Sequence, residues 1–221
     1  MAFTLDTYLV TQGDLSAGRS TVEIVDAALA GGVDVVQIRE KHRRARTRLE
    51  LAERLREPTA EAGVPLIIND RVDIAVAADA DGVHLGDDDL SVSVAREQLG
   101  EDAIIGRSVS TVEAAREAEE AGADYLGVGA VYETGSKDVD DEENGIGLGV
   151  VEDIADAVGI PFVGIGGVTP ERAPDVVGAG ADGVAVITAI TEAEDPARAT
   201  RELGEAVERG RRRRDELEGE A

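Results

Sequence analysis

The stretch Val33-Asp34-Val35-Val36-Gln37-Ile38-Arg39-Glu40-Lys41 is an apolar run that ends in polar and charged side chains. Its β-branched residues predict a strand over Val33–Ile38. Apolar and polar residues do not alternate strictly within this strand, which is typical of a parallel strand covered on both faces. A short apolar run that leads into a polar one recurs along the chain, so this stretch indicates the fold class.

Eight such runs predict strands, and a segment with helical character follows each of them. The predicted strands are Thr7–Val10, Val33–Ile38, Pro65–Asn69, Gly82–Leu85, Ala103–Gly106, Tyr125–Val128, Phe162–Ile165 and Gly183–Ile187. Eight βα units predict a (β/α)8 TIM barrel, which we expect to occupy residues 1–221 as a single domain. A doubly wound open sheet is the alternative, but eight repeats without a break favour a closed barrel.

Local signals mark the ends of the helices. Ser20 with Glu23, and Ser110 with Glu113, have the spacing of a capping box and predict two helix starts. Pro58 predicts a break or kink near Glu57 in the helix before the third strand. Residues 133–147 are rich in acid and glycine, and we expect them to form a mobile loop. The charged C-terminal tail, which includes the basic run 211–214, is interpreted as a solvated helix end.

The composition excludes several classes of protein. With 22 basic and 47 acidic residues, the net charge of −25 argues against binding to nucleic acid or to anionic membranes. Such an acidic surface suits high salt, where its self-repulsion is screened, so we expect a salt-loving source. The absence of cysteine excludes disulfides and thiol catalysis. There is no long apolar segment and no leader, so a cytoplasmic location is expected.

Lys41 and Lys137 are the only lysines, since the other twenty basic residues are arginine. Each lysine closes a polar run that follows an apolar, strand-like segment. A compact ammonium group is well suited to a phosphate, which predicts that both lysines bind one. The alternative is compositional bias that leaves two ordinary surface lysines.

In a TIM barrel the chemistry takes place where the strands lead into the following loops. Alternate residues of a strand face the same side, so Gln37, Arg39 and Lys41 are expected to point together into the barrel mouth. Polar side chains follow the other strands as well. These are Asn69 and Asp70, His84 and Asp87–Asp89, Ser108, Thr134 with Ser136 and Lys137, and Thr188.

Two ligand sites follow from these positions. Gly166 and Gly167 allow a phosphate to approach the backbone between the last two loops, although a tight turn would also use glycine. Asp70 and a carboxylate of Asp87–Asp89 offer hard oxygen ligands that suit Mg²⁺ beside substrate phosphates. The alternative is that Asp70 caps a helix and the three aspartates belong to the acidic surface. His84 is interpreted as a barrel residue rather than a catalytic base.

Taken together, these runs resemble the thiamine-phosphate synthase family. The matching segments occur in the family's order between about residues 7 and 190. They are Gln37–Lys41, Asn69–Arg71, Asp81–Gly86 with Asp89, Gly106–Ser108, Thr134–Lys137, Gly164–Gly167 and Gly183–Ile190. The resemblance implies a (β/α)8 barrel that joins a hydroxymethylpyrimidine diphosphate to a hydroxyethylthiazole phosphate. The products would be thiamine phosphate and pyrophosphate, and the expected partners are these small-molecule substrates.

The resemblance also implies a role for each matching residue. The pyrimidine diphosphate would contact Gln37, Ile38, Arg39, Glu40, Lys41, Asn69, Ser108 and Lys137. The thiazole phosphate would contact Thr134, Gly135, Ser136, Gly167, Ile187 and Thr188. Asp70 and Asp89 would bind Mg²⁺ as the cofactor, and Arg39, Lys41, Ser108 and Lys137 would be catalytic. The chain departs from the family pattern at Asp87, where glutamine is usual, at Gly135-Ser136, and in an acidic insertion over 138–144.

The expected chemistry is a dissociative displacement, because an electron-rich aminopyrimidine supports a cation at its methylene carbon. Mg²⁺ and the cationic side chains would stabilise the leaving diphosphate. Two alternatives remain open. One is a thiazole tautomerase or sugar-phosphate isomerase on the same barrel, and the other is a barrel that binds phosphate without catalysis. Release of pyrophosphate distinguishes the synthase from both.

Overall fold

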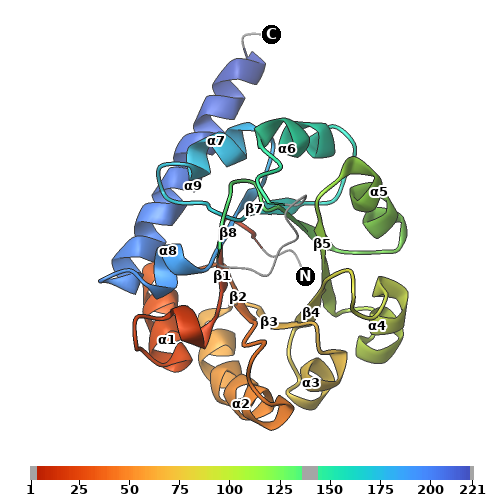
Figure 1. Ribbon diagram of the computed structural model, residues 1–221, viewed down its shortest axis with the longest axis vertical. Coiled ribbons are helices and arrows are strands. Elements are labelled where there is room, and N and C mark those ends of the chain that lie inside the picture. The colour runs from red at the N-terminus through yellow and green to blue at the C-terminus, as the bar shows by residue number, and fades with distance from the viewer. Residues whose placement is uncertain (1–3, 136–143, 220–221) are drawn as a thin grey trace.

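The computed structural model describes residues 4–135 and 144–219, which form one closed barrel (Figure 1). Its parallel strands pair in chain order, and β1 pairs with β8 through Tyr8 and Ala185. The strands are β1 (Thr7–Val10), β2 (Val35–Ile38), β3 (Leu66–Asn69), β4 (Gly82–Leu85), β5 (Ile104–Val109), β6 (Tyr125–Val128), β7 (Phe162–Ile165) and β8 (Gly183–Val186). The predicted (β/α)8 barrel is confirmed, and the open sheet is excluded because the first and last strands pair.

Helices surround the strands as an outer ring (Figure 1). They are the short 3-10 helix η1 (Gly13–Leu15), α1 (Thr21–Gly31), α2 (Ala45–Ala62), α3 (Val72–Ala77), α4 (Val92–Leu99), α5 (Val112–Glu120), α6 (Leu148–Ala155), α7 (Ala173–Gly178), α8 (Thr188–Thr191) and α9 (Pro196–Gly219). No helix among the described residues is both long and apolar enough to cross a bilayer.

The capping signals were correct in one case and shifted in another. Ser20 and Glu23 form the predicted capping box at the start of α1. Thr111, and not Ser110, caps α5, because its hydroxyl accepts the backbone N–H of Ala114. The predicted break near Glu57 is wrong, since α2 continues past Pro58 to Ala62; the alternative of a kink stays a prediction. The carbonyl that loses its partner there belongs to the exposed residue Arg54, so water can replace the missing bond.

Alternate strand residues divide between two apolar layers. Val35 faces the barrel interior beside Tyr8, while Val36 and Ile38 face the layer between strands and helices. Both sets of side chains are almost completely buried. Burial on both faces explains why the strands are continuously apolar in the sequence.

An aspartate precedes each even-numbered strand and binds the strand before it. Its carboxylate accepts a backbone N–H from the first or second residue of that odd-numbered strand, over 2.7–2.9 Å. The four pairs are Asp34 with Thr7, Asp81 with Leu66, Asp124 with Ile105, and Asp182 with Phe162. This fourfold repeat lies at the face opposite the barrel mouth, where TIM-barrel residues serve stability.

The basic run 211–214 belongs to the end of α9, and Arg212 and Arg213 are exposed as predicted, whereas Arg211 packs on the barrel. Arg211 forms an ion pair with Asp6 at 2.8 Å and donates to the carbonyl of Asp182 at 3.1 Å. At Gly210 an added Cβ would lie 2.8 Å from the carbonyl oxygen of Pro174, so α9 crosses α7 closely. The charged residues therefore hold the last helix against the strands.

Candidate active site

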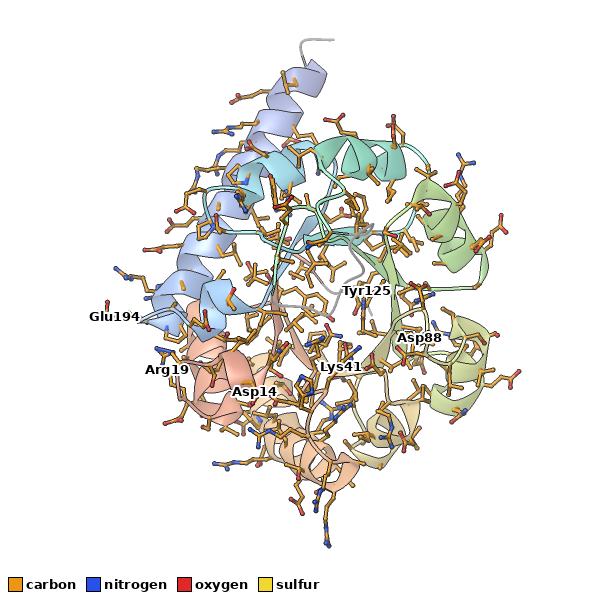
Figure 2. The ribbon with its side chains drawn as sticks, in the orientation of Figure 1. Asp14, Arg19, Lys41, Asp88, Tyr125 and Glu194 are labelled. Carbon is orange, nitrogen blue, oxygen red and sulfur yellow. The ribbon has the colours of Figure 1, made fainter. Side chains whose placement is uncertain are left out.

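A cavity of about 540 Å³ opens at the carboxyl ends of the strands. It brings together predicted site residues from the carboxyl ends of β2 to β5 and from the loops that follow them. They are Arg39, Lys41, Asn69, Asp70, Asp89 and Ser108. In the view of Figure 2, Lys41 lies near the barrel axis and Asp88 lies toward α4. We call this space the mouth cavity.

Arg39 and Asn69 lie at the bottom of the mouth cavity. Nε2 of Gln37 donates to Oδ1 of Asn69 over 2.8 Å, which joins β2 to β3. Nδ2 of Asn69 is buried and has no hydrogen-bond partner among the described residues. The Arg39 guanidinium is almost fully buried and donates to Oε1 of Gln12, in the loop after β1. Sequence reasoning missed Gln12, although a polar residue directly after a strand was the signal used elsewhere.

Lys41, Asp70 and Asp89 form a charged group above them. Nζ of Lys41 lies 3.5 Å from Oδ2 of Asp70. Oδ2 of Asp89 accepts the backbone N–H of Gly86 over 2.6 Å. Burial raises the pKa of Asp89, and the Asp70 carboxylate raises it further, while the Gly86 N–H and the Lys41 ammonium act in the opposite direction. Two acidic side chains are thus held close together.

This pair of carboxylates fits the predicted Mg²⁺. Among the residues that the structure describes, no group of three or more acidic, histidine or cysteine side chains is arranged to hold a metal. Mg²⁺ does not need one, because it commonly binds one or two carboxylates and completes its shell with water and substrate phosphates. The helix-cap alternative for Asp70 is wrong, since α3 has Arg71 at its N-cap with no side-chain cap.

The neighbouring Asp87 is used differently. Its carboxylate forms an ion pair with the guanidinium of Arg107 from β5, and its side chain is 72% exposed. The negative charge of Asp87, which departs from the family pattern, is therefore neutralised by Arg107. It does not add to the negative charge of the Asp70–Asp89 pair.

A second, smaller pocket lies between the loops after β6, β7 and β8. Thr134, Gly167, Ile187 and Thr188 line it, as predicted for a phosphate site, and it shares Ile165 and Gly166 with the mouth cavity. Gly167 has a φ of +62°, and a Cβ there would lie 2.8 Å from Cβ of Tyr132. Glycine is therefore required both for the turn and for the close approach of the two loops.

Several predicted site residues lie elsewhere. The side chain of Ile38 faces the outer core. Glu40 is buried and accepts the hydroxyl of Thr21 at 2.7 Å and the N–H of Gly13 at 3.1 Å, so its carboxylate fixes η1 against α1. Neither side chain lines the mouth cavity, although both belong to the predicted substrate-contact run.

Ser136 and Lys137 lie outside the described residues, as does most of the segment predicted to be mobile. The described ends of that segment are joined. The side chain of Asn144 accepts the N–H of Thr134 at 3.0 Å and donates to its carbonyl at 3.3 Å. The exposed Gly135 is the last described residue before the gap.

A buried chain of polar side chains, which we call the Tyr8–Ser108 chain, was not predicted from the sequence. The hydroxyl groups of Tyr8 and Tyr125 lie 2.7 Å apart, and Tyr125 lies 2.9 Å from Nδ1 of His84. Nε2 of His84 lies 2.9 Å from Oγ of Ser108 at the mouth cavity. Burial raises the pKa of both tyrosines, so both hydroxyl groups keep their protons.

The profile of the family described as thiamine monophosphate synthase matches residues 7–190. The chain belongs to this family. It is 65% identical to the thiamine-phosphate synthase of Natronomonas pharaonis over 201 residues, which cover 91% of this chain and 94% of the relative. It is 67% identical to that of Haloarcula marismortui over 207 residues, which cover 93% and 98%.

Solved structures agree. The thiamine phosphate pyrophosphorylase of Pyrococcus furiosus superposes with a TM-score of 0.85 at 41% identity, covering 94% of this chain and 97% of the other. A 3-hexulose-6-phosphate synthase, at 20% identity and a TM-score of 0.66, shares the fold alone. The thiamine monophosphate synthase family, the barrel fold and the assignment as an enzyme that forms thiamine phosphate are thus confirmed.

Proposed function

We propose that the chain joins 4-amino-5-hydroxymethyl-2-methylpyrimidine diphosphate to 4-methyl-5-(2-hydroxyethyl)thiazole phosphate by a Mg²⁺-dependent dissociative displacement. The observation that supports this most strongly is the Asp70–Asp89 pair beside Lys41, in the same cavity as Arg39. Acids to hold a divalent ion, together with cations to hold phosphate oxygens, suit a diphosphate leaving group.

In this proposal the pyrimidine diphosphate occupies the mouth cavity. Arg39 and Lys41 bind its phosphate oxygens, while Asn69 and Ser108 bind its remaining polar atoms. Mg²⁺, held by Asp70 and Asp89, would supply positive charge to the diphosphate when bound. The family resemblance adds Lys137 as a further residue that contacts the diphosphate.

The carbon–oxygen bond breaks with both electrons moving to the diphosphate. Arg39 and Lys41 then stabilise more charge in the transition state than in the ground state, which is the kind of binding that accelerates a reaction. The thiazole nitrogen forms the new bond to the methylene carbon with its lone pair. Its phosphate occupies the second pocket. That this pocket shares Ile165 and Gly166 with the mouth cavity supports binding of the two substrates side by side. No protein nucleophile is needed.

The test is an assay of pyrophosphate release with and without Mg²⁺. We expect release that depends on Mg²⁺ and on both substrates, with losses of several orders of magnitude in Lys137→Ala and Asp70→Asn. Each tenfold loss corresponds to about 1.4 kcal/mol. A thiazole tautomerase or an isomerase would turn over without releasing pyrophosphate. Near-normal turnover in both variants would refute the assignment of these residues.

We also propose that the enzyme works in the cytoplasm of a salt-loving cell and does not bind nucleic acid. The net charge of −25 supports this, and so do the halophilic archaea among the sources of its relatives. The melting temperature should rise as potassium chloride is added up to molar concentrations, because salt screens the repulsion between acidic side chains. Full activity at low salt with loss in molar salt would contradict the proposal.

A further inference from the structure

The Tyr8–Ser108 chain crosses the barrel interior beneath the mouth cavity, and the proposed function uses only its last member. His84 on β4 and Tyr125 on β6 lie on either side of Gly106 on β5, which is in register with both. The centroids of their two rings are 5.5 Å apart. His84, Gly106 and Tyr125 therefore lie at one level across three neighbouring strands, and Tyr8 joins them from β1.

Two glycines make room for these rings. A Cβ at Gly106 would lie 2.2 Å from Cζ of Tyr125, and one at Gly127 would lie 3.0 Å from Cε1 of His84. No larger residue fits at Gly106 while Tyr125 stays in place. The positions of the imidazole and the phenol are thus fixed by the strands that flank them.

The direction of the hydrogen bonds follows from the buried end of the chain. The Tyr8 hydroxyl is buried, and its one hydrogen bond among the described residues is with Tyr125. A buried hydroxyl without an acceptor costs about 1–3 kcal/mol, so Tyr8 donates to Tyr125. Tyr125 then donates to Nδ1 of His84, which must be unprotonated. A neutral imidazole with a bare Nδ1 carries its proton on Nε2 and donates it to Ser108.

We propose that His84 is a positioning residue whose Nε2–H donates to Ser108, which leaves the Ser108 hydroxyl proton free to donate to the pyrimidine diphosphate. With the opposite tautomer, the Ser108 hydroxyl would donate its proton to Nε2 of His84. Ser108 could then offer the substrate only a hydrogen-bond acceptor. The proposal rests on the proposed function, which places Ser108 against this substrate. It adds that the Tyr125 hydroxyl, through His84, selects the donor role of Ser108.

The tautomer can be measured directly by nitrogen-15 NMR of histidine-labelled enzyme. The chain has only two histidines, and the exposed His42 serves as an internal reference. His84→Gln removes the signals of His84, so the signals that remain belong to His42. We expect the shifts of a protonated Nε2 and an unprotonated Nδ1 for His84. The opposite tautomer, or a mixture of both, would overturn the proposal whatever the activity of the enzyme.

Tyr125→Phe and Tyr8→Phe form a matched pair, because each removes one buried hydroxyl but only Tyr125 contacts His84. We expect kcat/KM for the pyrimidine diphosphate to fall about tenfold or more in Tyr125→Phe and less than about threefold in Tyr8→Phe. KM for the thiazole phosphate should stay unchanged in both, which general damage to the fold would not allow. Equal losses in the two variants would overturn the role proposed for the Tyr8–Ser108 chain.

A double-mutant cycle shows whether His84 acts through Ser108. His84→Leu should lower kcat/KM for the pyrimidine diphosphate about as far as Ser108→Ala does, and the double variant should be no worse than either. His84→Gln, which keeps a donor at the position of Nε2, should recover part of the loss. Additive losses would overturn the proposal. Full activity of Ser108→Ala would instead refute the contact between Ser108 and the pyrimidine diphosphate. The donor role proposed for Ser108 would be refuted with it.

Discussion

Gln37 donates to Oδ1 of Asn69 over 2.8 Å, and this bond determines which end of the Asn69 amide is available to a ligand. Because Oδ1 already has a partner, the buried Nδ2 is the atom left to bind a substrate. The donor is held in place before the substrate arrives, which reduces the entropy lost on binding.

Asn69→Asp tests this arrangement. The aspartate keeps an acceptor for Gln37 but replaces the Nδ2 donor with a second oxygen. We expect kcat/KM for the pyrimidine diphosphate to fall roughly a hundredfold, the equivalent of a lost hydrogen bond to a charged group. Steady-state kinetics of pyrophosphate release give the value, and an unchanged melting temperature is the control for folding. Wild-type kinetics would show that Nδ2 does not contact the substrate.

Asp89→Asn and Asp87→Asn compare two neighbouring carboxylates. Mg²⁺ that binds the folded state alone raises the melting temperature by mass action. We expect that rise in the parent and in Asp87→Asn, whose carboxylate is paired with Arg107, but not in Asp89→Asn. Thermal unfolding at several Mg²⁺ concentrations measures it. The reverse pattern would place the metal at Asp87.

Gly106→Ala should destabilise the barrel because its methyl group would overlap the Tyr125 ring. Overpacking of this kind costs about 1–3 kcal/mol or more. Gly149→Ala in α6 is the matched control, since nothing lies within 4 Å of its added methyl group and alanine favours a helix by up to about 1 kcal/mol. Urea unfolding of both variants checks the difference in sign.

Asp34→Asn should change how stability depends on pH. Burial raises the pKa of Asp34 above its ordinary value, with smaller opposing effects from Thr7 and Thr4. Stability from this group is therefore fully present below its unfolded pKa and is lost as the pH rises through the raised folded value. At neutral pH the asparagine variant should be more stable, by less than about 1 kcal/mol because the carboxyl group is partly exposed. Chemical denaturation should show this gain shrinking as the pH falls toward the ordinary pKa of aspartate.

The sequence was sufficient to predict the positions of the strands and most of the residues at the barrel mouth. β1, β4, β6 and β7 have the predicted bounds, because short apolar runs between turn residues leave little choice of limits. The polar residues after each strand were also informative, since a closed parallel barrel brings those ends to one face. This rule identified Arg39, Lys41, Asn69, Asp70 and Ser108 without any coordinates, and the family resemblance singled out Asp89 from the run Asp87–Asp89.

What the sequence could not show depends on contacts between distant segments. The aspartates such as Asp34 and Asp182 are ordinary acids in an acidic chain until their partner strands are known. Glu40 follows the same spacing as the cavity residues, but its contact with Thr21 turns its carboxylate toward α1. Tyr8 lies in β1 and His84 lies in β4. They are far apart in the sequence, so no local pattern links them.

The contact between Arg211 and both Asp6 and Asp182 also bears on the order of assembly. Those aspartates precede β1 and β8, the two strands that are furthest apart in sequence and must still lie edge to edge. Joining such remote segments carries the largest loop-closure entropy of any pairing in the barrel. Arg211 of α9 therefore ties together the segments that lead into the first and last strands, and this contact can form only after residue 211 has been made.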